Sequence, residues 1–180
     1  MNLPNKLTLT RILLIPVFVA CMETIGTDYY IALIVFAIAS FTDFLDGNIA
    51  RKCGLVTTFG KFMDPLADKL LVLSAFVLLS ANGQVPSWIT IIILARELAI
   101  TGFRTIAASK GVILAAGKSG KIKTVTQMMT ILIMLTNDLP LLGLSFSLGT
   151  CFMYLACVMT IYSGAEYIIK NINVLDLENI

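Results

Sequence analysis

Long apolar stretches separated by short polar connections dominate the chain. Six of them approach the roughly 20 residues that a helix needs to cross the hydrocarbon core of a bilayer. They cover residues 7–22, 29–49, 62–80, 86–107, 124–142 and 148–169. Glycine, asparagine and other turn-forming residues lie between them, as at 26–28 and 82–84. The pattern predicts an all-α polytopic membrane protein with six transmembrane helices and a single domain over residues 1–180.

A short polar segment, residues 1–6, precedes the first apolar stretch. Pro4 and Asn5 stand in it, directly ahead of the apolar run. We expect this N-terminal segment to lie along the inner membrane interface before the first transmembrane helix begins.

Composition supports a membrane location. Hydrophobic residues make up 58% of the chain and charged residues 13%, a balance that a water-soluble domain of this length could not bury. The net charge of +2 is too small to indicate nucleic-acid binding. Histidine is absent, so carboxylates are the expected acid and base groups.

The basic residues predict the orientation. With the N-terminus inside, all 13 lysines and arginines fall in cytoplasmic connections or in the cytoplasmic halves of helices, as the positive-inside rule requires. The outer connections carry only Glu23, Asp28 and Asp138 as charged residues. Six crossings return the chain to the side where it began, so both termini are predicted to be cytoplasmic.

Four aspartates form the main candidate site. Asp43 and Asp46 lie one helical turn apart near the inner end of the second stretch, and Asp64 and Asp68 do the same in the third. The two helices would be antiparallel neighbours, so the four carboxylates could converge. An aspartate at the centre of a membrane helix costs about 2.5 to 3.5 kcal/mol, which demands compensation. Carboxylates without His or Cys favour Mg²⁺ or Mn²⁺, and two such ions would neutralise four aspartates.

Small and basic residues accompany the aspartates on these faces. Gly47, Ala50 and Gly60 either allow close helix packing or leave room for a ligand against the backbone. Arg51 follows at the end of the acidic face, where we expect it to contact a phosphate or a carboxylate.

The acidic segment carries a family resemblance. From Asp43 to Asp68 it reads D-x2-D-G-x2-A-R-x8-G-x3-D-x3-D and resembles the signature of the CDP-alcohol phosphatidyltransferases. Four further stretches look like the branch of that family that makes phosphatidylglycerophosphate: NLPNKLTLTRILLIPVF, GKFMDPLADKLLV, ARELAITGFR and GKIKT.

The resemblance assigns roles to the motif residues. It implies that Asp43, Asp46 and Asp64 bind metal, and that Asp68 both approaches the metal site and acts as general base in a direct displacement. Contacts to the CDP-lipid are implied for Gly47, Ala50, Arg51, Thr57 and Gly60, and for the N-terminal Asn5 and Thr8. For the N-terminal pair, a helix cap is an equally good interpretation.

An acceptor that carries its own phosphate needs a second anion site. The candidates are Arg96, Arg104, Lys121 and Lys123. The two arginines are eight residues apart and close to one helical face, and the two lysines stand at the cytoplasmic entrance to the fifth helix, where the positive-inside rule also explains them. An arginine as deep as Arg96 needs a partner, either Glu97 or Glu166.

Taken with these residues, the resemblance implies transfer of a phosphatidyl group from CDP-diacylglycerol to glycerol 3-phosphate. The products would be phosphatidylglycerophosphate and CMP. It also implies a homodimer in the lipid of a bacterial cell membrane, with its active site facing the cytoplasm. Serine, inositol phosphate and phosphatidylglycerol are alternative acceptors. A cation-coupled transporter is the alternative from another class; it explains the aspartates, but neither Arg51 nor the pair Arg96 and Arg104.

Overall fold

Six long helices make up the computed structural model, which describes residues 3–24, 29–53, 58–112, 114–115, 117–136 and 147–174. The helices are α1 (Leu3–Thr24), α2 (Tyr30–Cys53), α3 (Thr58–Ala81), α4 (Ser87–Ser109), α5 (Lys118–Leu135) and α6 (Leu148–Asn171), and a 3-10 turn, η1 (Ile172–Val174), follows. No strand occurs within these described ranges. The predicted all-α class and the six helical stretches are therefore confirmed.

Three helix starts precede the predicted ones: α3 begins at Thr58 in place of residue 62, and the starts of α1 and α5 are the most informative. The first helix runs without a break from Leu3, so residues 3–6 belong to α1 and do not form a separate segment ahead of it. Lys118 is the first residue of α5, whereas the apolar pattern predicted a start at residue 124. In both cases polar residues extend an apolar helix, because the backbone hydrogen bonds of a helix do not depend on the hydropathy of its side chains.

The connection between α3 and α4 is short and well defined. Gly83 has a φ of 76°, a left-handed conformation that favours glycine. The amides of Gln84 and Val85 both donate to the carbonyl oxygen of Leu79. This turn reverses the chain within a few residues and sets α4 against α3.

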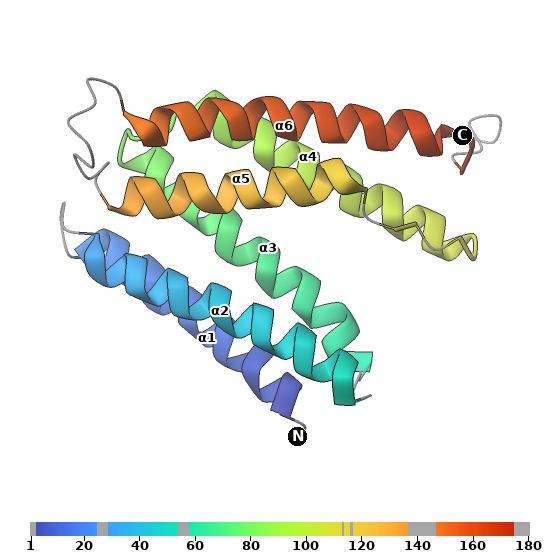
Figure 1. Cartoon of the computed structure of the whole chain (residues 1–180), viewed down its shortest axis with the longest axis horizontal. Coiled ribbons are helices and arrows are strands. Elements are labelled where there is room, and N and C mark those ends of the chain that lie inside the picture. The colour runs from blue at the N-terminus through green and yellow to red at the C-terminus, as the bar shows by residue number, and fades with distance from the viewer. Residues whose placement is uncertain are drawn as a thin grey trace.

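The helices pack as two antiparallel pairs joined through α3 (Figure 1). One pair is α1 with α2, the other is α5 with α6, and α3 contacts members of both as well as α4. In Figure 1, α1 begins and α6 ends at the right-hand ends of their ribbons. The same side holds the end of α4 and the start of α5, and the candidate site lies toward it.

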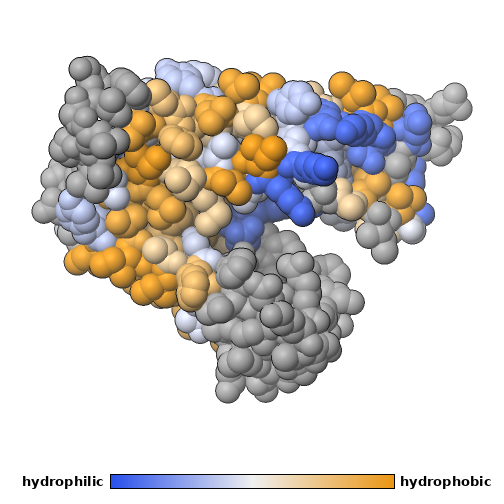
Figure 2. Space-filling model, in the orientation of Figure 1, coloured by the Kyte–Doolittle hydropathy of each residue, from blue (hydrophilic) through white to orange (hydrophobic). Residues whose placement is uncertain are grey.

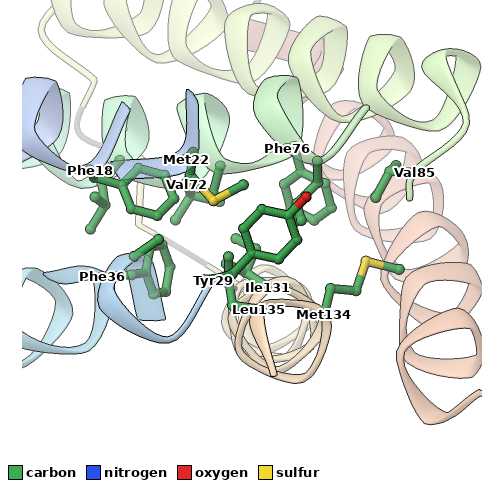
Figure 3. Close-up of a cluster of buried hydrophobic side chains, with 14 of the residues drawn as sticks. Phe18, Met22, Tyr29, Phe36, Val72, Phe76, Val85, Ile131, Met134 and Leu135 are labelled. Atoms are coloured by element: carbon green, nitrogen blue, oxygen red, sulfur yellow. The ribbon is translucent and has the colours of Figure 1, made fainter. Parts of the chain in front are cut away.

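A cluster of buried apolar side chains joins all six helices, and Figure 3 shows part of it. The rings of Phe18 and Phe36 meet at a centroid distance of 5.8 Å, and Phe76 of α3 is fully buried. Tyr29 lies in the same cluster, and its hydroxyl oxygen accepts a hydrogen bond of 3.1 Å from the side-chain amide of Asn82. Buried apolar side chains thus hold the six helices together.

The outer faces of the described helices are also apolar (Figure 2). Leu13, Ile91, Leu98 and Ile169 are each more than 60% exposed, which suits a lipid environment better than water. Among the described residues, α6 is the one helix that is long and apolar enough by itself to cross a membrane, and the apolar stretch Tyr30–Thr42 is shorter. Six crossings and cytoplasmic termini remain predictions.

Candidate functional site

An inner cavity of about 230 Å³ lies among α3, α4 and α5. Its ionisable lining residues are Asp68, Lys69, Arg96, Glu97, Arg104 and Lys123. Among the lining residues that the structure describes, four cations against two carboxylates give a net positive charge. The part of the wall that α5 supplies consists of Gly120, Lys123, Thr124 and Gln127, which follow the i, i+3, i+4, i+7 spacing of one helical face.

Glu97 holds two of these cations. Its Oε1 accepts a hydrogen bond of 3.2 Å from Nη1 of Arg96 and a second one from Nζ of Lys123. Glu97 is only 7% exposed and Lys123 only 4%. A buried ammonium group requires a partner that compensates for lost hydration, and Glu97 supplies it. Of the two predicted partners of Arg96, Glu97 is therefore the one that pairs with it in this structure.

Two residues of α6 determine the position of the Arg96 side chain. Its Nη2 donates a hydrogen bond of 3.1 Å to the hydroxyl oxygen of Ser163. The next residue, Gly164, lies so close that a Cβ atom added there would be 3.1 Å from Cγ of Arg96. The absence of a side chain at Gly164 lets the aliphatic part of Arg96 pass close to α6 on its way to the cavity.

Tyr167, one turn farther along α6, places Arg104. The guanidinium Nε donates a hydrogen bond of 3.0 Å to the tyrosine hydroxyl oxygen, and Cζ lies 5.1 Å from the ring centroid, within the range of a cation–π interaction. Phe103 packs edge-on against the same ring. On α3, Lys69 donates a hydrogen bond to the hydroxyl of Thr101.

An outer cavity of about 460 Å³ adjoins the inner one and opens among α4, the start of α5 and the end of α6. Its ionisable lining residues are Arg96, Arg104, Lys118, Glu166, Tyr167 and Lys170. Glu166 and Lys170 form an ion pair within the last turns of α6. Figure 2 shows the corresponding concentration of hydrophilic surface toward the right of the molecule, in contrast to the apolar left.

The structure brings most of the predicted acceptor residues together. Arg96, Arg104 and Lys123 line the inner cavity beside Asp68. Lys121 is exposed and lines neither the inner nor the outer cavity. Successive residues of a helix are separated by about 100°, so Lys121 and Lys123 point in different directions once both belong to α5.

Of the predicted metal and nucleotide residues, Thr8 is buried in α1. Thr57 lies outside the described residues, and so do the side chains of Asn5, Asp43, Asp46, Ala50, Arg51 and Asp64 and the surroundings of Gly47 and Gly60, although their helices are described. No group of three or more His, Cys, Asp or Glu side chains comes together among those described. The helices that carry the aspartates, α2 and α3, contact each other.

Several lining residues escaped the sequence prediction: Lys69, Lys118, Gln127, Ser163, Tyr167 and Lys170. One signal could have identified those of α6. Ser163, Glu166, Tyr167 and Lys170 follow the spacing of a single helical face at the end of an apolar stretch, and polar groups in such a stretch usually face the interior of the protein or a water-filled cavity.

Comparison with known proteins adds an independent line of information. The family model described as CDP-alcohol phosphatidyltransferase matches residues 1–162. A CDP-diacylglycerol–glycerol-3-phosphate 3-phosphatidyltransferase of Bacillus subtilis is 42% identical, over 99% of this chain and 99% of its own length. Proteins with the same name from Rickettsia felis and Pseudomonas fluorescens are 37% and 36% identical, over 92% and 93% of this chain and 93% and 89% of their own lengths.

Proposed function

The chain belongs to the CDP-alcohol phosphatidyltransferase family, and on this basis we propose that it transfers a phosphatidyl group from CDP-diacylglycerol to glycerol 3-phosphate. The names of its relatives support this pair of substrates. The structural observation that carries the proposal is the shared cavity of Asp68 with Arg96, Arg104 and Lys123. A phosphorylated alcohol needs a base for its hydroxyl and cations for its phosphate, and this cavity offers both.

Asp68 is the proposed general base. A hydroxyl group is a weak nucleophile at neutral pH, and a nearby carboxylate accepts its proton as the attack proceeds. The acceptor oxygen forms a new bond to the β-phosphorus of CDP-diacylglycerol, the bond from that phosphorus to the CMP oxygen breaks, and CMP departs. The proton of the acceptor ends on Asp68.

Arg96, Arg104 and Lys123 are the proposed acceptor-phosphate residues. The phosphate of glycerol 3-phosphate would lie against them, with its free hydroxyl toward Asp68. Arginine suits this role because its planar guanidinium donates two parallel hydrogen bonds to a phosphate. Lys121 is not part of this proposal, because it lines neither cavity.

Asp43, Asp46, Asp64 and Asp68 are the proposed ligands of two Mg²⁺ or Mn²⁺ ions. Their donor set consists only of carboxylate oxygens, which fits these cations. The contact between α2 and α3 is compatible with a shared site. When bound, the ions would stabilise negative charge on the pyrophosphate and on the departing CMP.

The remaining family positions are proposed to hold the CDP-lipid: Asn5, Thr8, Gly47, Ala50, Arg51, Thr57 and Gly60. We further propose six membrane crossings with both termini and the active site on the cytoplasmic side of a bacterial membrane, and a homodimer as the assembled form. The exposed apolar side chains on the outer helix faces support the membrane location.

One assay tests the proposed function directly. Purified protein is supplied with CDP-diacylglycerol, with Mg²⁺ or Mn²⁺, and with glycerol 3-phosphate, serine, inositol phosphate or phosphatidylglycerol in turn, and the release of CMP is measured. We expect release with glycerol 3-phosphate and little with the others. A preference for serine would remove the role given to the basic cavity. Absence of CMP with every acceptor, combined with cation uptake into proteoliposomes, would favour a transporter instead.

A further inference from the structure

We propose that the outer cavity is a first binding site for the phosphate of the acceptor, occupied before the acceptor reaches the inner cavity beside Asp68. The ligand class is a small phosphate monoester in solution. This inference rests on the proposed function, and it assigns roles to Lys118 and Lys170 that go beyond it.

The charge of the outer cavity suits such a ligand. Arg96, Arg104, Lys118 and Lys170 line it, and Glu166 is the one carboxylate among the described residues of its lining. The cavity volume, about 460 Å³, is about twice that of the inner one, about 230 Å³. A concave surface of one charge sign concentrates ions of the opposite sign and raises their association rate. The outer cavity can therefore collect a dianion from solution.

The two cavities adjoin each other and share part of their lining. Arg96, Arg104 and Gly120 line both of them. Gly120 contributes no side chain to the boundary, and even a Cβ atom at this position would lie 4.0 Å from Nη2 of Arg96. A phosphate held by the two arginines on the outer side can thus reach the inner side while it keeps contact with at least one of them.

The carboxylate of Glu166 lies where an incoming phosphate could contact Lys170. This carboxylate pairs with Lys170, whose side chain is 69% exposed. Exposed ion pairs of this kind contribute little to stability, so an incoming phosphate can replace the carboxylate at Lys170. The inner pair of Glu97 and Lys123 is buried and is far harder to separate. The outer cavity is therefore the one that opens readily to a ligand from solution.

The test compares Lys118→Ala with Lys121→Ala. Both lysines are exposed near the start of α5, but only Lys118 lines the outer cavity. At low ionic strength, we expect Lys118→Ala to lower kcat/KM for glycerol 3-phosphate roughly three- to tenfold, because a cation that steers the ligand is lost. The kcat value and the KM for CDP-diacylglycerol should stay unchanged, and Lys121→Ala should match the wild type.

Three further measurements sharpen this test. Lys118→Arg should restore kcat/KM, Glu166→Gln should raise it, and the Lys118→Ala defect should shrink as salt shortens the range of the electrostatic attraction. Inorganic phosphate should also inhibit Lys118→Ala less strongly than the wild type, in competition with glycerol 3-phosphate. Equal values for Lys118→Ala and Lys121→Ala, or a loss confined to kcat, would overturn the inference.

Lipid composition separates the two sources of phosphate. The kinetics are measured in nanodiscs of phosphatidylcholine alone and in nanodiscs that also contain an anionic phospholipid. A defect of Lys118→Ala that persists in phosphatidylcholine supports a soluble phosphate monoester. A defect that requires anionic lipid would assign the cavity to lipid headgroups and overturn the inference. If the wild type releases no CMP with glycerol 3-phosphate, the proposed function itself fails, which is a distinct result.

Discussion

The apolar cluster and the basic inner cavity use helices in different ways. The cluster around Phe18, Phe36 and Phe76 is held by shape, because apolar side chains from all six helices fill one common space. In the cavity, each placed cation depends on a specific partner, as Arg96 and Lys123 depend on Glu97. The first region tolerates other apolar side chains of suitable volume, whereas the second requires particular atoms at particular positions.

This difference predicts a separation of phenotypes. Changes in the apolar cluster should reduce the free energy of unfolding and leave substrate recognition intact. Changes in the cavity should reduce turnover or acceptor recognition and leave the fold intact. Both regions share α3, α4 and α5, so the separation is a strict test of whether one helix can serve packing at one end and chemistry at the other.

The largest effect is expected from Asp68→Asn. The amide has nearly the shape of the carboxylate but cannot accept the acceptor's proton, so CMP release should fall by about 10²- to 10⁴-fold. Thermal unfolding in detergent should remain close to that of the wild type. The control is Glu23→Gln, which neutralises an exposed carboxylate in the last turn of α1. Turnover of Asp68→Asn within tenfold of the wild type would contradict a base at this position.

Phe76→Ala should have the largest effect on stability. The ring is fully buried, and its removal leaves a cavity, for which about 3 to 5 kcal/mol of unfolding free energy is typical. Unfolding in a denaturing detergent measures the loss, and Ile91→Ala, on the exposed outer face of α4, is the control. The KM for glycerol 3-phosphate should not change while the variant is folded. A raised KM would mean that the two regions are coupled.

Lys123→Ala should weaken acceptor recognition. A hydrogen bond to a charged group contributes about 1.5 to 3 kcal/mol, so kcat/KM for glycerol 3-phosphate should fall about 10- to 100-fold. Lys121→Ala should leave it unchanged, since Lys121 lines neither cavity. Equal losses in the two variants would point to a general effect of positive charge on α5.

These two lysines also illustrate what sequence reasoning could and could not predict. The apolar pattern identified the six helices, and the spacing of Arg96 and Arg104 within one helix was sufficient to bring them to one cavity. For Lys121 and Lys123 the answer depended on where α5 begins. Polarity predicted a start after both residues, but the helix starts at Lys118, and only this start fixes the directions of their side chains.

The partners of the arginines were harder to predict, because they come from a distant part of the chain. Arg96 meets Ser163, and Arg104 meets Tyr167, across the packing of α4 on α6. The sequence contains the regular spacing of these α6 residues, but it does not state which helix they face. Tertiary packing decides that, and the motif residues gave no information about α6.

The smallest effect, and the finest test of the comparison, is expected from Gly164→Ala. A Cβ atom here would be 3.1 Å from Cγ of Arg96, whereas nothing lies within 4 Å of a Cβ at Gly102. The arginine must therefore move by a few tenths of an ångström in the first variant and not in the second. Since small displacements of positioning groups reduce rates, we expect a roughly two- to fivefold loss of kcat/KM for glycerol 3-phosphate in Gly164→Ala alone.

Both changes replace glycine by alanine within a helix, which by itself favours helix formation by up to about 1 kcal/mol, so stability should not fall with activity. A loss of stability in Gly164→Ala with unchanged acceptor kinetics would mean that this close approach serves the packing of α4 on α6, as in the apolar cluster, and not the position of Arg96.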